Sequence, residues 1–415
     1  MKTYFTLNSE CILVKGALRG AIYDLKSENV FSVDEISTKI LDQLNSGKNF
    51  LRVLKGNDII QEKLVAYLDN LEGRGMGNWS EKYNKTIVVL PDLNKTLRYV
   101  LHLELTTGCN LRCLHCYNES EISKLHNNNK VSVDDWKRTI TEAYQIGCRR
   151  IQFIGGEPFL KRELLYELIQ FARDIGYSSL EVSTNGTLIT RKDLKFLKDY
   201  GVGLAYSFYS HKFQVHDLIT NGKGSWKKTL AVVNKSLGIG LALRINIVVM
   251  KQNEKDTIKT AEFLRSFGVE HIKIDSVQAA GRGCSDIITD EVINRQIVNK
   301  AIFAKITSNV FWRNRTGHNC FSEQICVGAD GNVYPCLAER KISYGNITKK
   351  SLTEIFFSEK ARYFKSLSKD KVEICRDCEY RYCCFDCRVR ALDVLGNDVH
   401  PKPWWCTYNP YKGEW

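Results

Sequence analysis

Three cysteines early in the central part of the chain have a spacing that suits iron chemistry. Cys109, Cys113 and Cys116 form the pattern C-x3-C-x2-C within "TTGCNLRCLHCYNE". Three soft thiolates on one short loop can hold three irons of a four-iron cluster, which leaves the fourth iron open to another ligand. Two other interpretations stay open: a zinc loop that uses the adjacent His115, or buried cysteines that pack as small hydrophobic residues.

Two short motifs follow the next two strand-like runs. In "IGGEP", Gly155 and Gly156 allow backbone to approach a ligand closely, and Glu157 can accept a hydrogen bond from an ammonium group. In "STNG", the hydroxyl of Ser183 and the amide of Asn185 suit a ribose. Each motif alone is typical of an ordinary turn. Motifs of this kind at the ends of successive strand-like runs favour one shared ligand site.

The C-terminal part holds a second concentration of cysteine. Gly331, just before "NVYPC", permits a tight turn around a cluster. Cys383 is surplus by spacing, and Cys11, Cys148 and Cys284 are interpreted as spare thiols. Zinc ribbons would fit the same spacing. The remaining eight cysteines make two possible sets of four: Cys320, Cys326, Cys336, Cys375, Cys378, Cys384, Cys387 and Cys406.

Length and composition describe a globular protein of two or three domains. The chain has 415 residues, of which 43% are hydrophobic and 26% charged. We see neither a signal peptide nor an apolar run of membrane-spanning length, and therefore expect a cytoplasmic protein without a membrane partner. In a reducing compartment, fifteen cysteines indicate metal or redox chemistry rather than disulfides.

The formal charge of +13 could indicate nucleic acid, a membrane surface or an acidic peptide as a partner. The Lys and Arg residues are spread along the chain instead of forming one tract. Iron–sulfur clusters bound by thiolates carry net negative charge and would offset part of the excess. These two points argue against nucleic acid as the partner.

The elements that must position these motifs fall into five segments. Residues 1–80 predict a small α+β unit with three short strands, then a helix capped by Ser32 and Glu35 and a helix capped by Asn57. Residues 81–97 predict a linker, and residues 277–319 a bridging region with a helix at 288–306. The cysteine-rich segment 320–415 is irregular and needs metal to hold it together.

Residues 98–276 alternate six strand-like runs with helix-like runs, several of which end in Gly. Such alternation predicts a parallel sheet, either closed into a partial barrel or open and doubly wound. In both arrangements ligands bind at the carboxyl ends of the strands. All the motifs described for this segment follow such strand ends.

The motifs of residues 98–276 together resemble the radical S-adenosylmethionine superfamily. The resemblance rests on the three cysteines, "GGEP", "STNG", Ser207 in "AYSFYS", "HD" at 216–217, and Arg244 in "LRINIVV". It implies an α/β fold with a partial (β/α)6 TIM-like barrel. It also implies that the cluster's unique iron chelates S-adenosylmethionine, whose reductive cleavage gives a 5′-deoxyadenosyl radical that abstracts hydrogen from a substrate.

The same resemblance implies roles for single residues. Gly155, Gly156 and Glu157 would hold the methionine amino group of S-adenosylmethionine. Three side chains would lie near the ribose, namely Ser183, Asn185 and Ser207. Arg244 is the candidate for the methionine carboxylate, with a strand Arg that pairs with a helix as the alternative. His115 stands where the family usually has an aromatic residue near the adenine.

The cysteine-rich end resembles the SPASM extension of the same superfamily, which holds two auxiliary four-iron clusters. One cluster would take Cys320, Cys326, Cys336 and Cys387, and the other Cys375, Cys378, Cys384 and Cys406. The pattern usually has three residues before the cysteine placed at Cys387, and here there are two. Choosing Cys383 would restore that spacing but leave only four residues after Cys378. Three [4Fe-4S] clusters and S-adenosylmethionine are the cofactors expected.

Residues 1–80 resemble the small winged-helix peptide-recognition domain of many maturases of ribosomally made peptides. The resemblance implies that a leader peptide adds a strand at an exposed sheet edge, and a structural cap is the alternative. We therefore expect a radical enzyme of the sactisynthase type that links a Cys sulfur to a carbon in a precursor peptide, with ferredoxin or flavodoxin as the reductant. Carbon–carbon or carbon–oxygen cross-linking and anaerobic sulfatase-type maturation are alternatives. A nucleic-acid-binding or nucleic-acid-modifying protein with zinc ribbons is the alternative of a different class.

Overall fold

A computed structural model describes most of the chain. The described residues are 2–57, 60–88, 90–92, 99–128, 131–277, 280–283, 287, 305–385, 387–388, 400, 402–403 and 406–415. Residues 288–304 of the helix expected at 288–306 and the spare thiol Cys284 lie outside them, and residues 305–306 are not helical. No helix among the described residues is long and apolar enough to cross a membrane.

The N-terminal unit consists of two small antiparallel sheets and three helices. The strands are β1 (Tyr4–Leu7), β2 (Cys11–Lys15), β3 (Gly20–Asp24), β4 (Asn29–Val33) and β5 (Gly77–Ser80), and the helices are α1 (Glu35–Asn45), α2 (Phe50–Asn57) and α3 (Gln61–Gly73). β1 pairs with β5, and the other three strands form a sheet in the order β2-β3-β4. A core that includes Phe5, Leu41, Val53 and Leu68 holds the helices on the strands.

Both helix caps predicted in this unit are wrong. α1 begins two residues later than expected, because its N-cap is Asp34 and not Ser32, and the Asp34 carboxylate accepts the backbone N–H of Ser37. Asn57 ends the additional helix α2 instead of starting α3, which has Ile60 at its N-cap. In both cases a polar residue near the true boundary matched the capping pattern. The cap of α1 is a different residue, and α3 has no side-chain cap.

The centre of the molecule is a nine-stranded sheet in the order β11-β10-β9-β8-β7-β6-β12-β13-β14. Its first six strands in the sequence are mutually parallel: β6 (Val100–Glu104), β7 (Arg150–Ile154), β8 (Ser179–Thr184), β9 (Gly203–Ser207), β10 (Leu243–Val249) and β11 (Ile272–Ser276). The described residues show no pairing between β11 and the other end of the sheet, so the barrel is partial. This α/β architecture confirms the predicted fold class.

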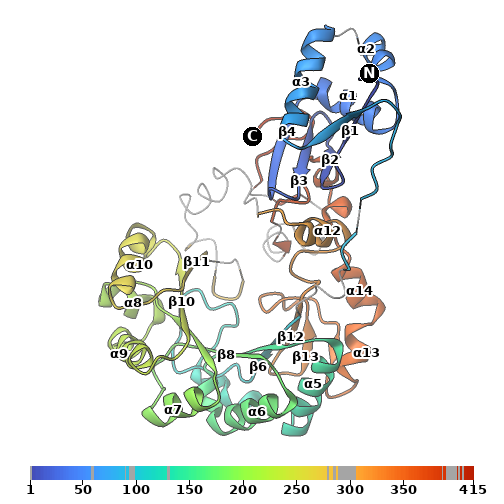
Figure 1. Cartoon of the computed structure of the whole chain (residues 1–415). Coiled ribbons are helices and arrows are strands. Elements are labelled where there is room, and N and C mark those ends of the chain that lie inside the picture. The colour runs from blue at the N-terminus through green and yellow to red at the C-terminus, as the bar shows by residue number, and fades with distance from the viewer. Residues whose placement is uncertain are drawn as a thin grey trace.

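Six helices cover the outer side of the curved parallel sheet (Figure 1). They are α5 (Val133–Ile146), α6 (Arg162–Ile175), α7 (Arg191–Asp199), α8 (Phe213–Thr220), α9 (Ser225–Gly238) and α10 (Thr257–Ser266). The strands turn apolar residues such as Leu101, Leu103 and Phe153 toward these helices. The alternate residues, among them His102 and Gln152, face the inside of the barrel. A polar lumen therefore lies next to an apolar shell.

The sheet continues into the cysteine-rich segment, which the sequence alone had described as irregular. β12 (Gln324–Val327) pairs in parallel with β6, and β13 (Asn332–Tyr334) and β14 (Gly345–Asn346) follow it as antiparallel strands. These strands are too short for a periodic signal. In the pairing of β12 with β6, Cys326 stands opposite His102. A cysteine of the C-terminal segment thus belongs to the barrel wall.

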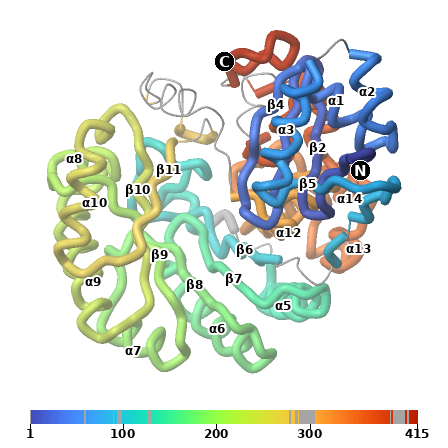
Figure 2. Tube along the Cα trace, turned by 45° about the horizontal axis from the view of Figure 1, so that its top comes forward, coloured from blue at the N-terminus to red at the C-terminus, as the bar shows by residue number. Residues whose placement is uncertain are grey.

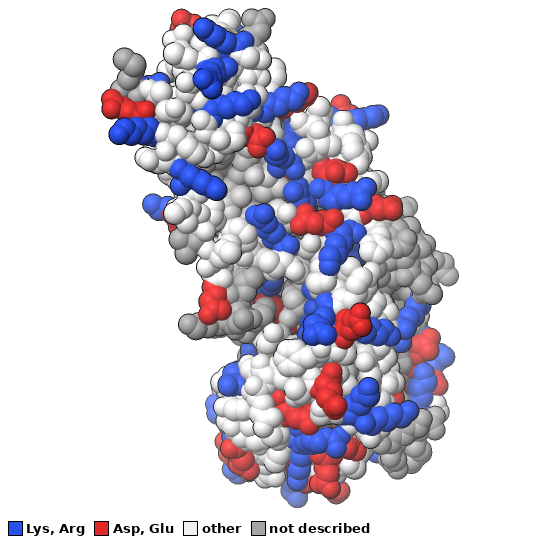
Figure 3. Space-filling view, turned by 90° about the vertical axis from the view of Figure 1, so that its right-hand side faces the viewer, with Lys and Arg blue, Asp and Glu red and all other residues white. Residues whose placement is uncertain are grey.

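The N-terminal unit rests on the C-terminal segment, as the two views in Figures 1 and 2 agree. The fully buried Tyr23 donates a hydrogen bond of 2.8 Å to the Glu379 carbonyl and accepts one of 3.3 Å from the Tyr382 N–H. Phe311, in α12 (Ser308–Thr316), packs edge-on against Tyr23. Two further helices of the C-terminal segment are α13 (Leu352–Phe356) and α14 (Glu359–Lys365). Figure 3 shows Lys and Arg interspersed with Asp and Glu over one face.

Candidate functional site

The C-x3-C-x2-C loop begins directly after β6, at the carboxyl end of the strand, as expected. Burial, and then the nearby Glu157 carboxylate, raise the pKa of the Cys109 thiol to about 12. Burial also raises the pKa of Cys113, with Cys109 and Cys116 as the next causes, so the three sulfurs lie close to one another. Among the described residues, no three Cys, His, Asp or Glu side chains converge closely enough to hold a single metal ion. The donor set fits a multi-iron cluster, whose thiolate ligands stand around several metal atoms.

A glycine and an arginine that follow β11 contact this cysteine loop and hold it in place. Arg282 donates three hydrogen bonds to its carbonyls: its N–H to Cys116 at 3.0 Å, its Nε to Cys113 at 2.9 Å and its Nη2 to Ser120 at 2.9 Å. Gly281 has φ 56°, and a Cβ there would overlap the carbonyl oxygens of Cys116 and Tyr117. Sequence reasoning missed this pair. Its only signal was the "GRG" that follows the last barrel strand.

The "GGEP" loop packs directly against the cysteine loop. The Gly156 N–H donates to the Thr106 carbonyl at 2.7 Å, and the Glu157 N–H donates to the Gly108 carbonyl at 2.9 Å. A side chain at Gly156 would overlap the Gly108 carbonyl oxygen, so this position has room for glycine only. Here the glycines bring two loops of the protein together, in addition to any contact with a ligand.

Glu157 is fully buried, and three donors of the protein occupy its carboxylate. These donors are the Thr184 hydroxyl at 2.8 Å, the Asn185 N–H at 2.9 Å and the Phe159 N–H at 3.2 Å. The carboxylate therefore fastens the "GGEP" loop to the "STNG" loop. The role of Glu157 at the methionine amino group stays a prediction. The backbone of Gly155 and Gly156 packs against the residues just before the cysteine loop.

Burial raises the pKa of Glu157 from 4.5 to about 7, because its hydrogen bonds offset only part of the desolvation. Between these values the folded protein holds a proton that the unfolded chain has released, so stability falls as the pH rises. We expect this group to remove on the order of 3 kcal/mol of stability between about pH 4.5 and 7. Melting temperatures from pH 5 to 8 should fall more steeply for the native protein than for Glu157→Gln. Equal slopes would show that Glu157 does not titrate in this range.

The other predicted ligand-binding residues lie around the same loop. Asn185 Nδ2 is 3.7 Å from Cys109 Sγ and donates to Asn110 at 3.0 Å. The Ser183 hydroxyl accepts from Gln152 at 2.9 Å inside the barrel, and Ser207 is the last residue of β9. His115 packs edge-on against Tyr209, with ring centroids 4.8 Å apart, and burial lowers its pKa to about 4. Their roles near the ribose and the adenine stay predictions.

The "HD" pair stabilises this side of the barrel. His216 Nδ1 accepts the Tyr209 N–H at 3.2 Å, which fixes the ring that faces His115. The Asp217 carboxylate accepts the N–H groups of Gly224 at 2.6 Å and Trp226 at 2.9 Å, at the start of α9. Both residues therefore orient the loops after β9 and α8.

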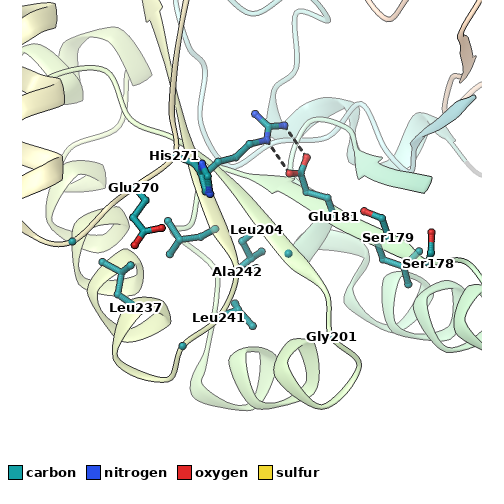
Figure 4. A pocket seen from close by; sticks show the side chains of 16 residues that line it. Ser178, Ser179, Glu181, Gly201, Leu204, Leu237, Leu241, Ala242, Glu270 and His271 are labelled. Atoms are coloured by element: carbon teal, nitrogen blue, oxygen red, sulfur yellow. Dashed lines mark hydrogen bonds and ion pairs between the residues drawn. The ribbon is translucent and has the colours of Figure 1, made fainter. Parts of the chain in front are cut away.

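Arg244 is already paired inside the barrel. Its Nε and Nη2 donate to the Glu181 carboxylate at 2.8 and 2.7 Å, and this pair lies at the edge of a cavity of about 750 Å³ (Figure 4). Arg244 is the second residue of β10, roughly 16 Å along the strand from its carboxyl end. A contact with the methionine carboxylate stays a prediction, and it would require this ion pair to exchange partners.

The C-terminal cysteines group as two sets. Burial and then Cys387 raise the pKa of Cys336 to about 11, and Cys336 and Cys320 both act on Cys326. Burial raises the pKa of Cys378, and Glu379, Cys384 and Cys375 raise it further. Burial and then Cys384 raise the pKa of the half-buried Cys406. Both groupings match the two predicted ligand sets, whose assignment to clusters stays a prediction.

Cys383, next to Cys384 in the chain, packs against Tyr23 of the N-terminal unit. Its Sγ donates to the Tyr380 carbonyl at 3.3 Å and lies 3.6 Å from the Tyr23 hydroxyl. It belongs to an apolar cluster with Phe311 and Tyr382 beneath the N-terminal unit. The position of Cys383 therefore suits a packing role, as the spacing had suggested.

Comparisons with known proteins agree with this site. Residues 103–264 match the Radical SAM superfamily model, and residues 320–379 match the SPASM model, described as an iron–sulfur cluster-binding domain. The AdoMet-dependent heme synthase of Methanosarcina barkeri is 27% identical over 74% of this chain and 96% of its own length. The subtilosin biosynthesis protein AlbA of Bacillus subtilis is 26% identical over 72% of this chain and 68% of its own length.

A solved structure extends the likeness of fold to nearly the whole chain. SuiB of Streptococcus suis, bound to its precursor peptide SuiA, superposes with a TM-score of 0.59 at 15% identity. The superposition covers 97% of this chain and 100% of that chain. It therefore includes the N-terminal unit, which neither family model matches.

Proposed function

We propose that this chain, a radical S-adenosylmethionine enzyme with a C-terminal SPASM domain that binds iron–sulfur clusters, cross-links a ribosomally synthesised precursor peptide. The product that we propose is a thioether between a Cys sulfur and a carbon of the same peptide. The observation that supports this proposal most is the fold likeness to SuiB over nearly the whole chain, N-terminal unit included. The likeness to AlbA, a subtilosin biosynthesis protein, points the same way.

The proposed cofactors are three [4Fe-4S] clusters and S-adenosylmethionine. Cys109, Cys113 and Cys116 would hold the cluster that, when reduced, would supply the electron for cleavage of S-adenosylmethionine. The C-terminal cysteines would hold an auxiliary cluster able to accept the electron released as the C–S bond forms. Arg282 holds the cysteine loop in one conformation through its three hydrogen bonds. His115, seated on Tyr209, closes the nucleoside side of the site.

The atoms of the proposed reaction balance as a two-electron oxidation of the peptide. One hydrogen atom leaves a peptide carbon and ends in 5′-deoxyadenosine, and the substrate thiol loses its proton. One electron goes to the 5′-deoxyadenosyl group and the other to an auxiliary cluster. Each cross-link therefore makes the peptide lighter by two hydrogens. Ferredoxin or flavodoxin is proposed to reduce the cluster at Cys109, Cys113 and Cys116 before each turnover. Its oxidised form would then take the electron left on the auxiliary cluster.

The N-terminal unit is proposed to bind the leader of the precursor peptide. In its three-stranded sheet, β2 and β4 are the outer strands, so an extended peptide could add to the sheet as a further strand. Because the unit packs on the C-terminal segment through Tyr23, a leader bound there is held beside the cysteine-rich part of the enzyme. A leader-binding role would explain why the chain carries this unit. A porphyrin substrate has no leader for such a unit to bind.

The test is an anaerobic assay with reconstituted enzyme, S-adenosylmethionine, a reductant and a short Cys-containing peptide, chosen from the open reading frames that flank this gene. We expect 5′-deoxyadenosine and a peptide lighter by two hydrogens per cross-link. Alkylation of free thiols should fail at the linked Cys, which separates a thioether from a carbon–carbon or carbon–oxygen link.

Two matched controls sharpen the assay. Peptide without its leader should be a poor substrate, whereas a peptide with each Cys replaced by Ala should bind and remain unlinked. Because a heme synthase is among the relatives, iron porphyrins are tested in parallel. Turnover of a porphyrin without turnover of the peptide would contradict the proposal, as would peptide oxidation that leaves every thiol free.

A further inference from the structure

A buried ion pair joins the segments that carry two of the proposed clusters. Glu104, the last residue of β6, is 1% exposed and forms an ion pair with Arg340 of the C-terminal segment. Its other oxygen accepts a hydrogen bond of 2.8 Å from Asn118 Nδ2. Asn118 stands two residues after Cys116, and Arg340 stands four residues after Cys336. One carboxylate therefore holds both segments.

The guanidinium of Arg340 lies between two tyrosine rings that come from the same two segments. Its carbon is 4.7 Å from the ring centroid of Tyr334 and 5.7 Å from that of Tyr117. The Tyr334 hydroxyl donates to Asp330 at 2.8 Å, which fixes that ring. The two ring contacts and the ion pair with a buried carboxylate together fix the position of this guanidinium.

This charge pair is close to Cys326 of the first auxiliary set. Cys326 stands opposite His102 in the pairing of β12 with β6, and Glu104 is two residues further along β6, on the same face of the sheet. Adjacent strands and a two-residue step place the two Cα atoms roughly 8 Å apart. Because Arg340 is paired with Glu104, both charges lie near this cysteine.

We infer that Arg340 and Glu104 are positioning residues that set the reduction potential of the first auxiliary cluster, with opposite signs. The inference rests on the proposed ligand set Cys320, Cys326, Cys336 and Cys387. Reduction adds one negative charge to a cluster, and charges near its sulfurs shift the potential. Inside a protein such interactions are stronger than in water. Arg340 favours the reduced cluster, and Glu104 favours the oxidised one.

The test is a redox titration of the holoenzyme followed by electron paramagnetic resonance. The signal of the first auxiliary cluster is identified as the one that Cys326→Ala removes. At the wild-type midpoint, Arg340→Met should raise the oxidised-to-reduced ratio at least tenfold, which corresponds to a downward shift of about 59 mV. Glu104→Gln should shift the midpoint upward, and Arg340→Lys should stay near wild type.

Arg138 offers a matched control. It also ties the barrel to the C-terminal segment, because it donates from α5 to the Ile347 carbonyl, but its ion pairs are with Asp135 and Glu142 of its own helix. Arg138→Met should leave the midpoint unchanged. Shifts of the same sign for Arg340→Met and Glu104→Gln, or no shift with full iron content, would overturn the inference.

The two levels of the proposal fail in different ways. If Cys326→Ala removes no iron, the assumed ligand set is wrong and the inference falls with it. The peptide assay remains a separate test of the proposed function, since it counts deoxyadenosine and cross-links. Opposite shifts with iron content preserved would support the inference even if the peptide substrate were a different one.

Discussion

Replacing Cys116 by alanine is expected to reduce formation of 5′-deoxyadenosine to the background rate and to remove about four irons per chain. Cys116 has no substitute, because the described part of the loop offers only Cys109 and Cys113 as further thiols. Its Sγ also accepts the Ser120 N–H at 3.3 Å, within the turn that Arg282 clamps. Iron and sulfide analysis, with chromatography of the nucleoside product, measures both effects.

Cys148→Ala is the matched control for this prediction. Cys148 is fully buried in the barrel core, and burial raises its pKa to about 12. Its loss should cost about 1 kcal/mol of stability and no iron. If Cys116→Ala kept its full iron content and still formed deoxyadenosine, the radical cluster would have to be elsewhere in the chain.

Replacing Cys384 by alanine is expected to remove the second auxiliary cluster, about four irons per chain, while Cys383→Ala keeps them. The two thiols have different neighbours. Cys384 raises the pKa of Cys378 and Cys406, whereas Cys383 contacts Tyr23 of the N-terminal unit. Cys383→Ala should instead lower the melting temperature, because it leaves a small cavity in a packed cluster.

Iron analysis of the two variants side by side decides between the neighbouring cysteines. The native protein and Cys11→Ala, a buried thiol of the N-terminal unit, complete the series. Iron lost from Cys383→Ala and retained in Cys384→Ala would exchange the two roles. Retention in both variants would mean that this cluster has an open ligand position or that the cluster is absent.

The barrel could be predicted closely because its signals are local. The segment at 132–147 carries a capping box from Ser132 to Asp135 and a left-handed Gly147, and both bound α5 in the structure. The cysteine loop and "GGEP" needed only a strand to end before each of them. A motif of a few adjacent residues together with the parallel-sheet rule was enough to bring them to one edge.

What the sequence could not provide depends on residues far apart in the chain. Glu104 and Arg340 are 236 positions apart, and nothing near either residue indicates the pair. Arg282 was missed for the same reason, since its partners are the carbonyls of a distant loop. The pairing of Arg244 with Glu181 also joins two strands, and only the register of the sheet makes it visible.

The contact of Tyr23 with Glu379 has a consequence for the order of synthesis, because it spans 356 positions. A ribosome delivers the N-terminal unit long before the loop that carries Cys375, Cys378 and Cys384. During that interval Tyr23 and the apolar residues around it have no surface to cover them. The contact between the N-terminal unit and the C-terminal segment can therefore form only late in synthesis. A shortened chain without residues 1–80 would expose the aromatic face of Phe311 and Tyr382.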